Sequence, residues 1–331
     1  MTVQITIIGL GQIGTSIGLA LADQKELVRR TGHDREMRIS RLAEKMGALD
    51  RVMLNLPNSV RDADLVILAL PTDQLKETLD IIAQDLKENA VVMDTAPVKE
   101  IVAKWAKEIL PQGRYYVGLT PVINPAYLQT HESGVEAAHA DLFHGGLMAI
   151  VVPPQTPSEA VKLASDLTRL LGASALFADP VEVDSLMAAT HILPQLMAAA
   201  LLNITVDQPG WREARKVAGR AYAEVTGPIA QFSDPEALSS SALLTQENIL
   251  RVTDSLIASL QALRNDIKNQ DAQALTERLQ RARLGREEWW KQRQTTDYAA
   301  QEMGMPVETP KSSDMFGRLF GLGGRKPRQN K

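Results

Sequence analysis

Residues 3–14 have the sequence VQITIIGLGQIG. The apolar residues 3–8 are typical of a buried strand, and the apolar periodicity that begins at residue 13 is that of a helix. Between them lie three glycines with G-x-G-x-x-G spacing, Gly9, Gly11 and Gly14. A glycine-rich turn that joins a strand to a helix indicates a dinucleotide-binding fold, whereas the same glycines without this context would indicate only a flexible loop.

This turn supplies the groups that a pyrophosphate needs. Gly9 permits the tight turn, Gly11 lets the backbone approach the phosphates, and Gly14 lets the helix and the strand pack closely. The free N–H groups and the dipole of the helix N-terminus attract the anion. We therefore expect the cofactor to contact the whole turn, namely Gly9, Leu10, Gly11, Gln12, Ile13 and Gly14.

The residues after a second expected strand, 28–31, bear on the choice of cofactor. Asp34 lies roughly 20 residues beyond the glycines, where a carboxylate can accept hydrogen bonds from the adenosine ribose hydroxyls. This position favours NAD. The next residue, Arg35, carries a guanidinium that could hold a 2′-phosphate, so NADP remains an alternative.

The composition is that of an ordinary globular protein, with 331 residues of which 44% are hydrophobic, which is enough for two domains. A net charge of -4 offers no basic surface for nucleic acid. The chain has no cysteine, and no residue spacing predicts a metal site. The N-terminus does not resemble a signal peptide, and we expect no membrane-spanning segment. These features predict a cytoplasmic protein.

Strands alternate with helices in the first part of the chain. Further strands are expected at residues 65–70, 91–94, 115–119 and 147–152, with helices at 74–86 and 99–109. This alternation predicts an α/β fold, a doubly wound parallel sheet of the Rossmann type, for a nucleotide domain at 1–155. Nucleotides bind at the carboxyl edge of such sheets, so Leu70, Pro71 and Thr72 are further candidates for cofactor contact.

The second part, residues 156–304, is expected to be helical apart from one brief strand at 175–178. Long helices are expected at 185–202, 213–225, 236–269 and 272–300. Their apolar faces need partners, so we expect an all-α domain that forms a homodimer. Residues 305–331 are basic and rich in Pro, Ser and Gly, and we expect a disordered tail, with an amphipathic turn as the alternative.

Three stretches resemble the prephenate/arogenate dehydrogenase family. They are SGVEAAHADLFHG at 133–145, DSLMAATHILP at 184–194 and DTAPVK at 94–99. The last two are similar to the D-x-x-x-A-x-x-S-H-L-P helix and the D-x-x-S-V-K turn of that family, and the resemblance extends from residue 3 to about residue 248. It implies a Rossmann domain, a helical dimerisation domain and an active site between them.

By this resemblance the chain is expected to be an oxidoreductase of tyrosine biosynthesis, acting on a small-molecule substrate. The family oxidises the ring hydroxyl carbon of prephenate or arogenate, passes hydride to a nicotinamide, and releases carbon dioxide to give an aromatic product. Such an enzyme must orient the substrate, remove the hydroxyl proton with a base, and bind carboxylates.

The sequence departs from the family pattern at these three roles. Thr120 occupies the position of the family's histidine base, and threonine cannot act as a base near neutral pH. Pro97 replaces the serine that would contact the substrate hydroxyl, and it has no N–H. The substrate-binding arginine of the family aligns with Gly227. The loop at 120–133 is also longer than in the family pattern.

Replacement residues could restore the chemistry. His191, from the second motif, is one candidate catalytic residue, and His131 in the lengthened loop and Lys99 at a helix start are the others. Thr120 and Pro97 would line the substrate pocket, with Arg220 as a candidate carboxylate ligand. Two alternatives remain: a diverged dehydrogenase with another hydride-transfer substrate, or an NAD-binding protein without turnover.

Overall fold

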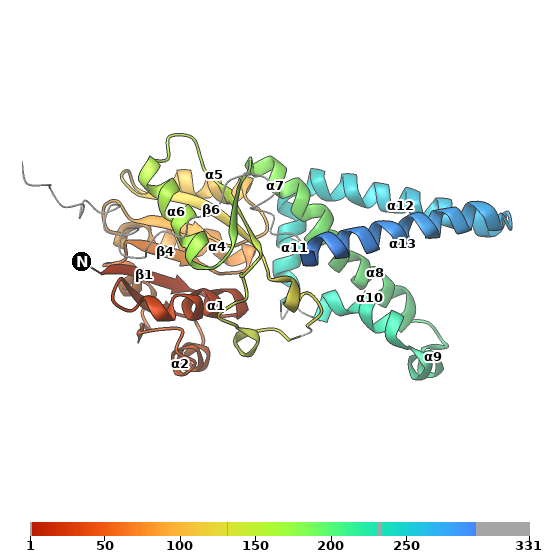
Figure 1. Cartoon of the computed structure of the whole chain (residues 1–331), viewed down its shortest axis with the longest axis horizontal. Helices are drawn as coiled ribbons and strands as arrows, with labels where there is room; N and C mark the ends of the chain where they lie inside the picture. The colour runs from red at the N-terminus through yellow and green to blue at the C-terminus, as the bar shows by residue number, and fades with distance from the viewer. Residues whose placement is uncertain (1, 131, 231–233, 296–331) are drawn as a thin grey trace, which may run out of the picture. The chain divides into compact units, whose positions relative to one another are not determined.

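The computed structural model describes residues 2–130, 132–230 and 234–295. It divides into two compact units, Met1–Pro180 and Val181–Asp297. Among the described residues, every strand lies in the first unit, and the second unit is helical (Figure 1). The expected tail at 305–331 lies outside the described residues.

The first unit is built on an eight-stranded sheet with the order β3-β2-β1-β4-β5-β6-β7-β8. Its strands are β1 (Val3–Ile8), β2 (Val28–His33), β3 (Arg51–Val52), β4 (Leu65–Leu68), β5 (Val91–Asp94), β6 (Tyr115–Val122), β7 (Leu147–Val151) and β8 (Ser174–Phe177). The strands from β3 to β6 pair in parallel, in the order of a Rossmann sheet. The predicted doubly wound α/β class is confirmed, although β7 is antiparallel to β6.

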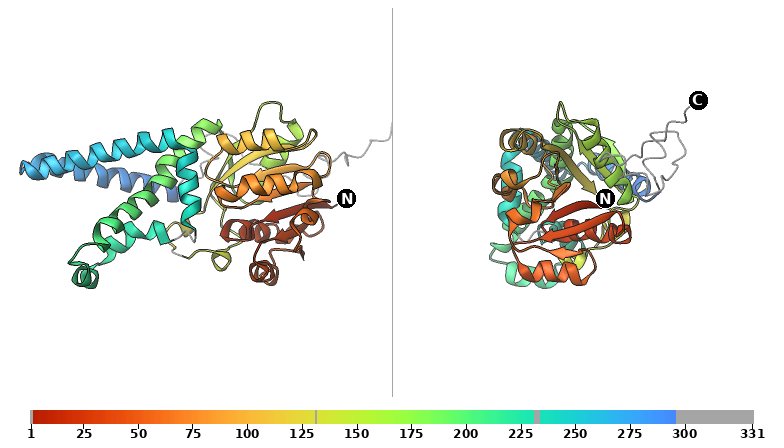
Figure 2. Two further views of the ribbon diagram at one scale, coloured as in Figure 1. Left: turned by 180° about the vertical axis from the view of Figure 1, so that it is seen from behind. Right: turned by 90° about the vertical axis from the view of Figure 1, so that its left-hand side faces the viewer.

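Helices cover both faces of this sheet (Figure 2). They are α1 (Gln12–Ala20), α2 (Met37–Lys45), α3 (Leu56–Val60), α4 (Thr72–Ile82), α5 (Glu100–Ile109) and α6 (Ser158–Leu170). The chain moves outward from β1 in opposite directions, and right-handed crossovers therefore place the helices on opposite faces. The central strands are buried on both faces, which explains their nearly continuous apolar sequence: Ile5, Ile7 and Ile67 are fully buried.

The first unit extends beyond the boundary expected at residue 155. After β7, the chain forms α6 and then β8, which pairs in parallel with β7, with Leu147 opposite Ser174. Leu163 and Leu167 of α6 are buried in the same core as β1. The physical reason is strand pairing: β8 gains its hydrogen bonds only as the last strand of this sheet, so the helical unit starts at Val181.

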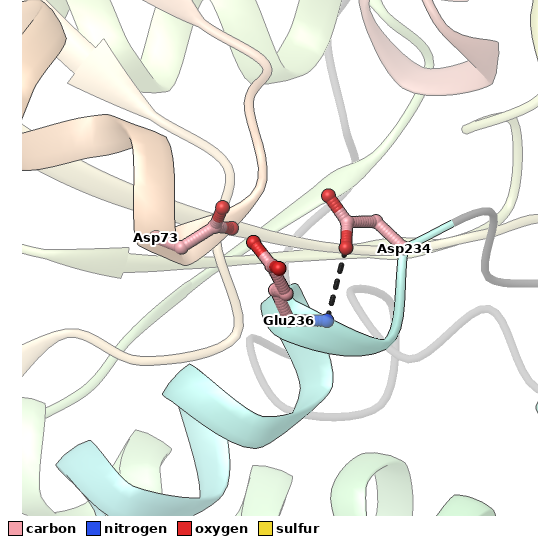
Figure 3. A group of neighbouring side chains, drawn as sticks. All are labelled: Asp73, Asp234 and Glu236. Carbon is pink, nitrogen blue, oxygen red and sulfur yellow. Dashed lines mark hydrogen bonds between the residues drawn. The ribbon is translucent and has the colours of Figure 1, made fainter.

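The second unit consists of seven α-helices and one π-helical segment among its described residues. They are α7 (Pro180–Met187), η5 (Ala188–Ile192, π-helical), α8 (Leu193–Val206), α9 (Trp211–Val217), α10 (Arg220–Ala230), α11 (Pro235–Leu244), α12 (Gln246–Lys268) and α13 (Ala272–Thr295). The residue Asp234 caps α11, and its Oδ1 accepts a hydrogen bond from the Glu236 N–H at 2.9 Å (Figure 3). A break between α9 and α10 divides the helix that the sequence predicted over 213–225.

The π-helical segment has a local cause in the sequence. Pro194 has no N–H and therefore cannot donate the hydrogen bond that a regular helix requires at that position. The helix widens just before it, over Ala188–Ile192, and the side chain of Gln195 donates from Nε2 to the carbonyl oxygen of His191 at 2.7 Å. Such insertions often occur at functional sites.

The helical unit leaves many apolar side chains exposed. The helices α12 and α13 form a long antiparallel hairpin (Figures 1 and 2). Exposed apolar residues on α8 and on this hairpin include Ile204, Leu250, Leu260, Ile267, Leu279 and Leu284. Surfaces of this kind usually contact a partner.

One helical run among the described residues, Pro180–Val206, has 27 residues and a mean hydropathy of 1.5, with 22% of its most apolar window buried. By length and composition alone it is apolar enough to cross a membrane. The sequence predicts a shorter helix at 185–202, whereas α7, η5 and α8 form one longer run.

Candidate functional site

The glycine turn starts at the end of β1, in a conformation that requires glycine. Gly9 has a φ of +87°, and a Cβ at this position would lie 2.4 Å from the carbonyl oxygen of Ala69. The N–H of Gly9 donates to the carbonyl oxygen of His33 at 2.9 Å, which ties the ends of β1 and β2 together. The turn is therefore held between the two neighbouring strand ends, as the predicted tight turn requires.

The other two glycines of the turn differ in their surroundings: Gly14 is closely packed, and Gly11 faces open space. A Cβ on Gly14 would lie 1.9 Å from the carbonyl oxygen of Gly9, so α1 packs directly on the turn. Gly11 is the N-cap of α1 with no side-chain cap, and a Cβ there would meet no atom within 4 Å. The helix N-terminus is thus open above Gly11, and its first N–H groups can bind an anion.

Asp34 lies where the sequence predicts a ribose-binding carboxylate, just past the end of β2. Its Oδ2 accepts a hydrogen bond from the Leu10 N–H at 2.8 Å, and its Oδ1 accepts from the Glu36 N–H at 2.9 Å. These bonds fix the carboxylate beside the glycine turn, and each oxygen keeps a further lone pair for a ligand. Arg35 is exposed at the same edge.

The residues after β4 join the glycine turn after β1 and Asp34 after β2 in this cofactor site. Because β4 pairs with β1, the residues after β4 lie next to the glycine turn. A Cβ on Gly9 would lie 2.8 Å from Leu70 Cδ2. Pro71 is the exposed N-cap of α4, and the side chain of Thr72 is buried. The structure thus brings the predicted cofactor residues of β1, β2 and β4 together at one edge of the sheet.

The neighbouring strands β5 and β6 carry a buried group of charged and polar side chains. Lys99 and Asp94 are both 0% exposed, and Lys99 Nζ donates to Asp94 Oδ1 at 2.6 Å. The Tyr116 hydroxyl donates to Asp94 Oδ2 at 2.5 Å. Gly118 provides the space for this group, since a Cβ there would lie 2.8 Å from Lys99 Cδ and 2.9 Å from the Tyr116 hydroxyl. Lys99 is thus held inside the nucleotide unit.

Two of the three positions that depart from the family pattern, Thr120 and Pro97, are neighbours. Thr120 on β6 is buried, and its hydroxyl donates to the carbonyl oxygen of Ala96 at 3.3 Å. Ala96 precedes Pro97, which lies half-buried in the turn between β5 and α5. The Ala96 N–H in turn donates to Asp94 Oδ1 at 2.9 Å. The buried Asp94 group therefore also sets the conformation of this turn.

The remaining substrate-site candidates lie in the helical unit or outside the described residues. His191 is half-buried within the π-helical segment, and burial lowers the pKa of its imidazole from the ordinary value of 6.5. The side chain of Arg220 is 91% exposed, and its guanidinium pairs with Glu224 on the same helix at 3.4 Å. His131 lies outside the described residues.

The lengthened loop after β6 is fastened to the nucleotide turn, which sequence reasoning missed. The Tyr127 hydroxyl donates to Asp141 at 2.6 Å, and the Tyr127 ring stacks on His139 with 4.5 Å between centroids. The Asp141 hydrogen bond raises the pKa of Tyr127 to about 12. The His139 N–H donates to Ser16 Oγ on α1 at 3.0 Å. The available signal was the length of the insertion, because the contacts of His139 with Tyr127 and Ser16 join residues that are far apart in sequence.

The segment that follows this loop also touches the glycine turn. Gln12 Nε2 donates to the carbonyl oxygen of Ala137 at 3.0 Å, in the 3₁₀ helix η4 (Val135–Ala137). The segment SGVEAAHADLFHG, noted in the sequence, thus lies against the glycine turn and α1. The fold and this site define the chain as a Rossmann-type nucleotide-binding protein with a helical second domain.

Comparisons with known proteins identify the family. Residues 17–176 match the family model described as the nucleotide-binding domain of prephenate dehydrogenase, and residues 179–281 match its dimerization domain. Together these models cover well over half of the chain, so this protein belongs to the prephenate dehydrogenase family. The predicted family and the dehydrogenase class are confirmed, and the first unit is a nucleotide-binding domain.

Individual relatives agree with this assignment. The chain is 26% identical to cyclohexadienyl dehydrogenase of Zymomonas mobilis over 85% of this chain and 94% of the relative. It is 26% identical to prephenate dehydrogenase of Bacillus subtilis, over 82% of this chain and 72% of the relative.

Solved structures show the same fold. Prephenate dehydrogenase from A. aeolicus, in complex with hydroxyphenyl propionate and NAD+, is similar with a TM-score of 0.76 at 22% identity, over 87% of this chain and 98% of that one. Synechocystis arogenate dehydrogenase has a TM-score of 0.67 at 21% identity, over 86% and 99% of the two chains.

Proposed function

We propose that this protein is an NAD-dependent dehydrogenase that oxidises a cyclohexadienyl acid of the prephenate or arogenate type in tyrosine biosynthesis. The observation that carries the proposal is the match of two consecutive prephenate dehydrogenase domains, at residues 17–176 and 179–281. In this reaction the substrate carbon gives a hydride to the nicotinamide and its hydroxyl gives up a proton. The ring carboxylate leaves as carbon dioxide, and its electron pair completes the aromatic ring.

The cofactor site fits NAD. The open space above Gly11 and the uncapped N-terminus of α1 suit a pyrophosphate, and the Asp34 carboxylate suits two ribose hydroxyls. A 2′-phosphate would bring a second negative charge next to that carboxylate. Arg35 is the group that could offset this repulsion, so NADP is the weaker alternative.

Replacing Asp34 with asparagine tests the cofactor preference. We expect Asp34→Asn to weaken NAD binding about tenfold, because hydrogen bonds to a charged acceptor are stronger than those to a neutral one. Removal of the negative charge should leave NADP binding unchanged or tighter. Calorimetric titration of both cofactors measures this, with Asp23→Asn at an exposed position as the control. Equal losses for NAD and NADP would show that Asp34 does not contact the ribose.

The residue that accepts the hydroxyl proton must differ from the one in the family pattern. Thr120 cannot accept the hydroxyl proton near neutral pH, and Pro97 offers neither a hydroxyl nor an N–H. Lys99 is buried and paired with Asp94, which suits a positioning role better than proton transfer. His191 has a lowered pKa, so its imidazole is neutral at pH 7 and able to accept a proton. We therefore assign the role of general base to His191.

This assignment predicts the acid side of the pH profile. A base must be unprotonated, so kcat/KM should fall as the pH drops through a pKa below 6.5, the direction in which burial moves His191. The variant His191→Asn should lose about 10²–10⁴-fold in rate. The pH dependence of NADH formation checks both, with His144→Asn at an exposed position as the control. An acid limb that survives in His191→Asn would assign the base elsewhere, with His131 as the next candidate.

The first experiment is NADH formation at 340 nm with prephenate and with arogenate, beside calorimetric titration of NAD alone. Turnover of either acid supports the proposal. Tight NAD binding without turnover of either acid would favour a diverged substrate or a non-catalytic NAD-binding protein. The replacement of the family histidine by Thr120 is the observation that favours this second candidate.

We propose a homodimer in the cytoplasm, and the helical unit supports the dimer. The exposed apolar residues of α8, α12 and α13 would be covered by a second copy, as the dimerization-domain match suggests, and the run Pro180–Val206 would pack on protein instead of lipid. The boundary between the two domains then falls near residue 180, with the basic tail as a separate segment. Sedimentation analysis of the purified chain without detergent tests the dimer, and a monomer would contradict it.

A further inference from the structure

The helical unit contains a buried side-chain amide, that of Gln195, whose nitrogen forms a hydrogen bond and whose oxygen has no partner among the described residues. Gln195 is 3% exposed and lies one turn after His191 on the same helical run. Its Nε2 donates to the His191 carbonyl oxygen, as described above. Its Oε1 is buried and has no hydrogen-bond partner among the described residues.

Two neighbouring buried hydroxyls in the same unit form hydrogen bonds, unlike Gln195 Oε1. Ser241 Oγ donates to the carbonyl oxygen of Ala237 at 2.9 Å, and Thr245 Oγ1 donates to that of Ser241 at 2.8 Å. These bonds are formed within the helices that carry the side chains. An unpaired buried acceptor is costly, about 1–3 kcal/mol, and is rare unless a ligand or water completes it. Gln195 Oε1 is therefore left for a partner other than the described residues, either a ligand or a water.

The geometry limits what that partner can be. The amide nitrogen of Gln195 is fixed on the His191 carbonyl, so the free atom is an oxygen that can only accept a hydrogen bond. The partner must carry an O–H or N–H group. The position next to the π-helical segment and His191 places this acceptor beside the residue assigned above as the general base.

We propose that Gln195 binds the substrate by accepting a hydrogen bond from its hydroxyl or amino group through Oε1. This inference rests on the proposed function and identifies a further binding residue for it. The ring hydroxyl is common to prephenate and arogenate, whereas only arogenate carries an amino group. Gln195 thus either orients the reacting hydroxyl or selects the amino acid over the keto acid.

Calorimetric titration of the full chain with NAD present tests this with three stable probes. They are 3-(4-hydroxyphenyl)propionate, which has the hydroxyl, L-tyrosine, which has the hydroxyl and the amino group, and 3-phenylpropionate, which has neither. We expect Gln195→Met to weaken the binding of donor-bearing probes by about 3- to 10-fold, the value of a neutral hydrogen bond, and to leave 3-phenylpropionate unchanged. A loss for both donor-bearing probes identifies the hydroxyl, and a loss for tyrosine alone identifies the amino group.

Two further variants separate recognition from structure. Gln246→Met makes the same change at an exposed position of α12 and should leave all three affinities unchanged. Gln195→Glu in its protonated form keeps both a donor for the His191 carbonyl and an acceptor oxygen, so at low pH it should still bind 3-(4-hydroxyphenyl)propionate or tyrosine in preference to 3-phenylpropionate. Unchanged affinities in Gln195→Met, or equal losses for all three probes, would overturn the inference alone. Failure of the wild-type protein to bind any probe would contradict the proposed substrate class as well.

Discussion

Replacing Gly11 with alanine is expected to weaken NAD binding about 10- to 100-fold, which corresponds to about 1.4–2.8 kcal/mol, while the fold stays intact. Gly11 has a φ of -70°, which any residue can adopt, and a Cβ there would meet no protein atom within 4 Å. The added methyl group therefore costs the free protein little. It occupies the space in which the pyrophosphate approaches the N-terminus of α1.

The measurement is calorimetric titration of NAD together with thermal unfolding of the free protein. Gly285→Ala is the matched control, because a Cβ on Gly285 in α13 also meets nothing within 4 Å and that glycine is remote from the turn in sequence. Gly14→Ala should behave differently and destabilise the free protein, since its Cβ would lie 1.9 Å from the Gly9 carbonyl oxygen. Unchanged NAD affinity in Gly11→Ala would move the cofactor away from this turn.

The nucleotide half of the site could be predicted from the sequence because its determinants are local. The glycine turn depends on a strand, a tight turn and a helix that follow each other directly, and Asp34 follows the next strand. The domain boundary could not be predicted in the same way. The strand β8 belongs to the sheet only because it pairs with β7, and a short strand does not carry the identity of its partner in its own sequence.

The substrate half depends on long-range contacts that composition and spacing do not contain. Lys99 was predicted as a catalytic candidate from its place at a helix start, but the structure buries it against Asp94 and Tyr116. Gln195 lies one residue after the recognised motif and was passed over, because its significance comes from an unsatisfied oxygen. A sequence shows which residues are polar, but only the structure shows which polar atoms are buried without a hydrogen-bond partner and so are candidates for ligand binding.

The buried Lys99 also gives the largest expected effect on stability. Lys99 and Asp94 are both completely buried, and the Tyr116 hydroxyl occupies the second carboxylate oxygen of Asp94. Removing one partner of such a pair leaves an uncompensated charge inside the protein, at a cost of about 3–5 kcal/mol. Removing both partners together costs less than the sum of the single losses, because neither charge is then left alone.

We therefore expect Lys99→Met to lower the free energy of unfolding of the nucleotide unit by about 3–5 kcal/mol, measured by urea denaturation. The double variant Lys99→Met with Asp94→Asn should recover part of this loss. Lys216→Met, which removes a partner of the exposed pair with Glu213, should change stability by less than about 1 kcal/mol. If Lys99→Met were as mild as Lys216→Met, the pair would not fix the β5–α5 turn. In that case Lys99 would be free for the catalytic role predicted from the sequence, and a loss of turnover in a stable Lys99→Met variant would be the evidence for it.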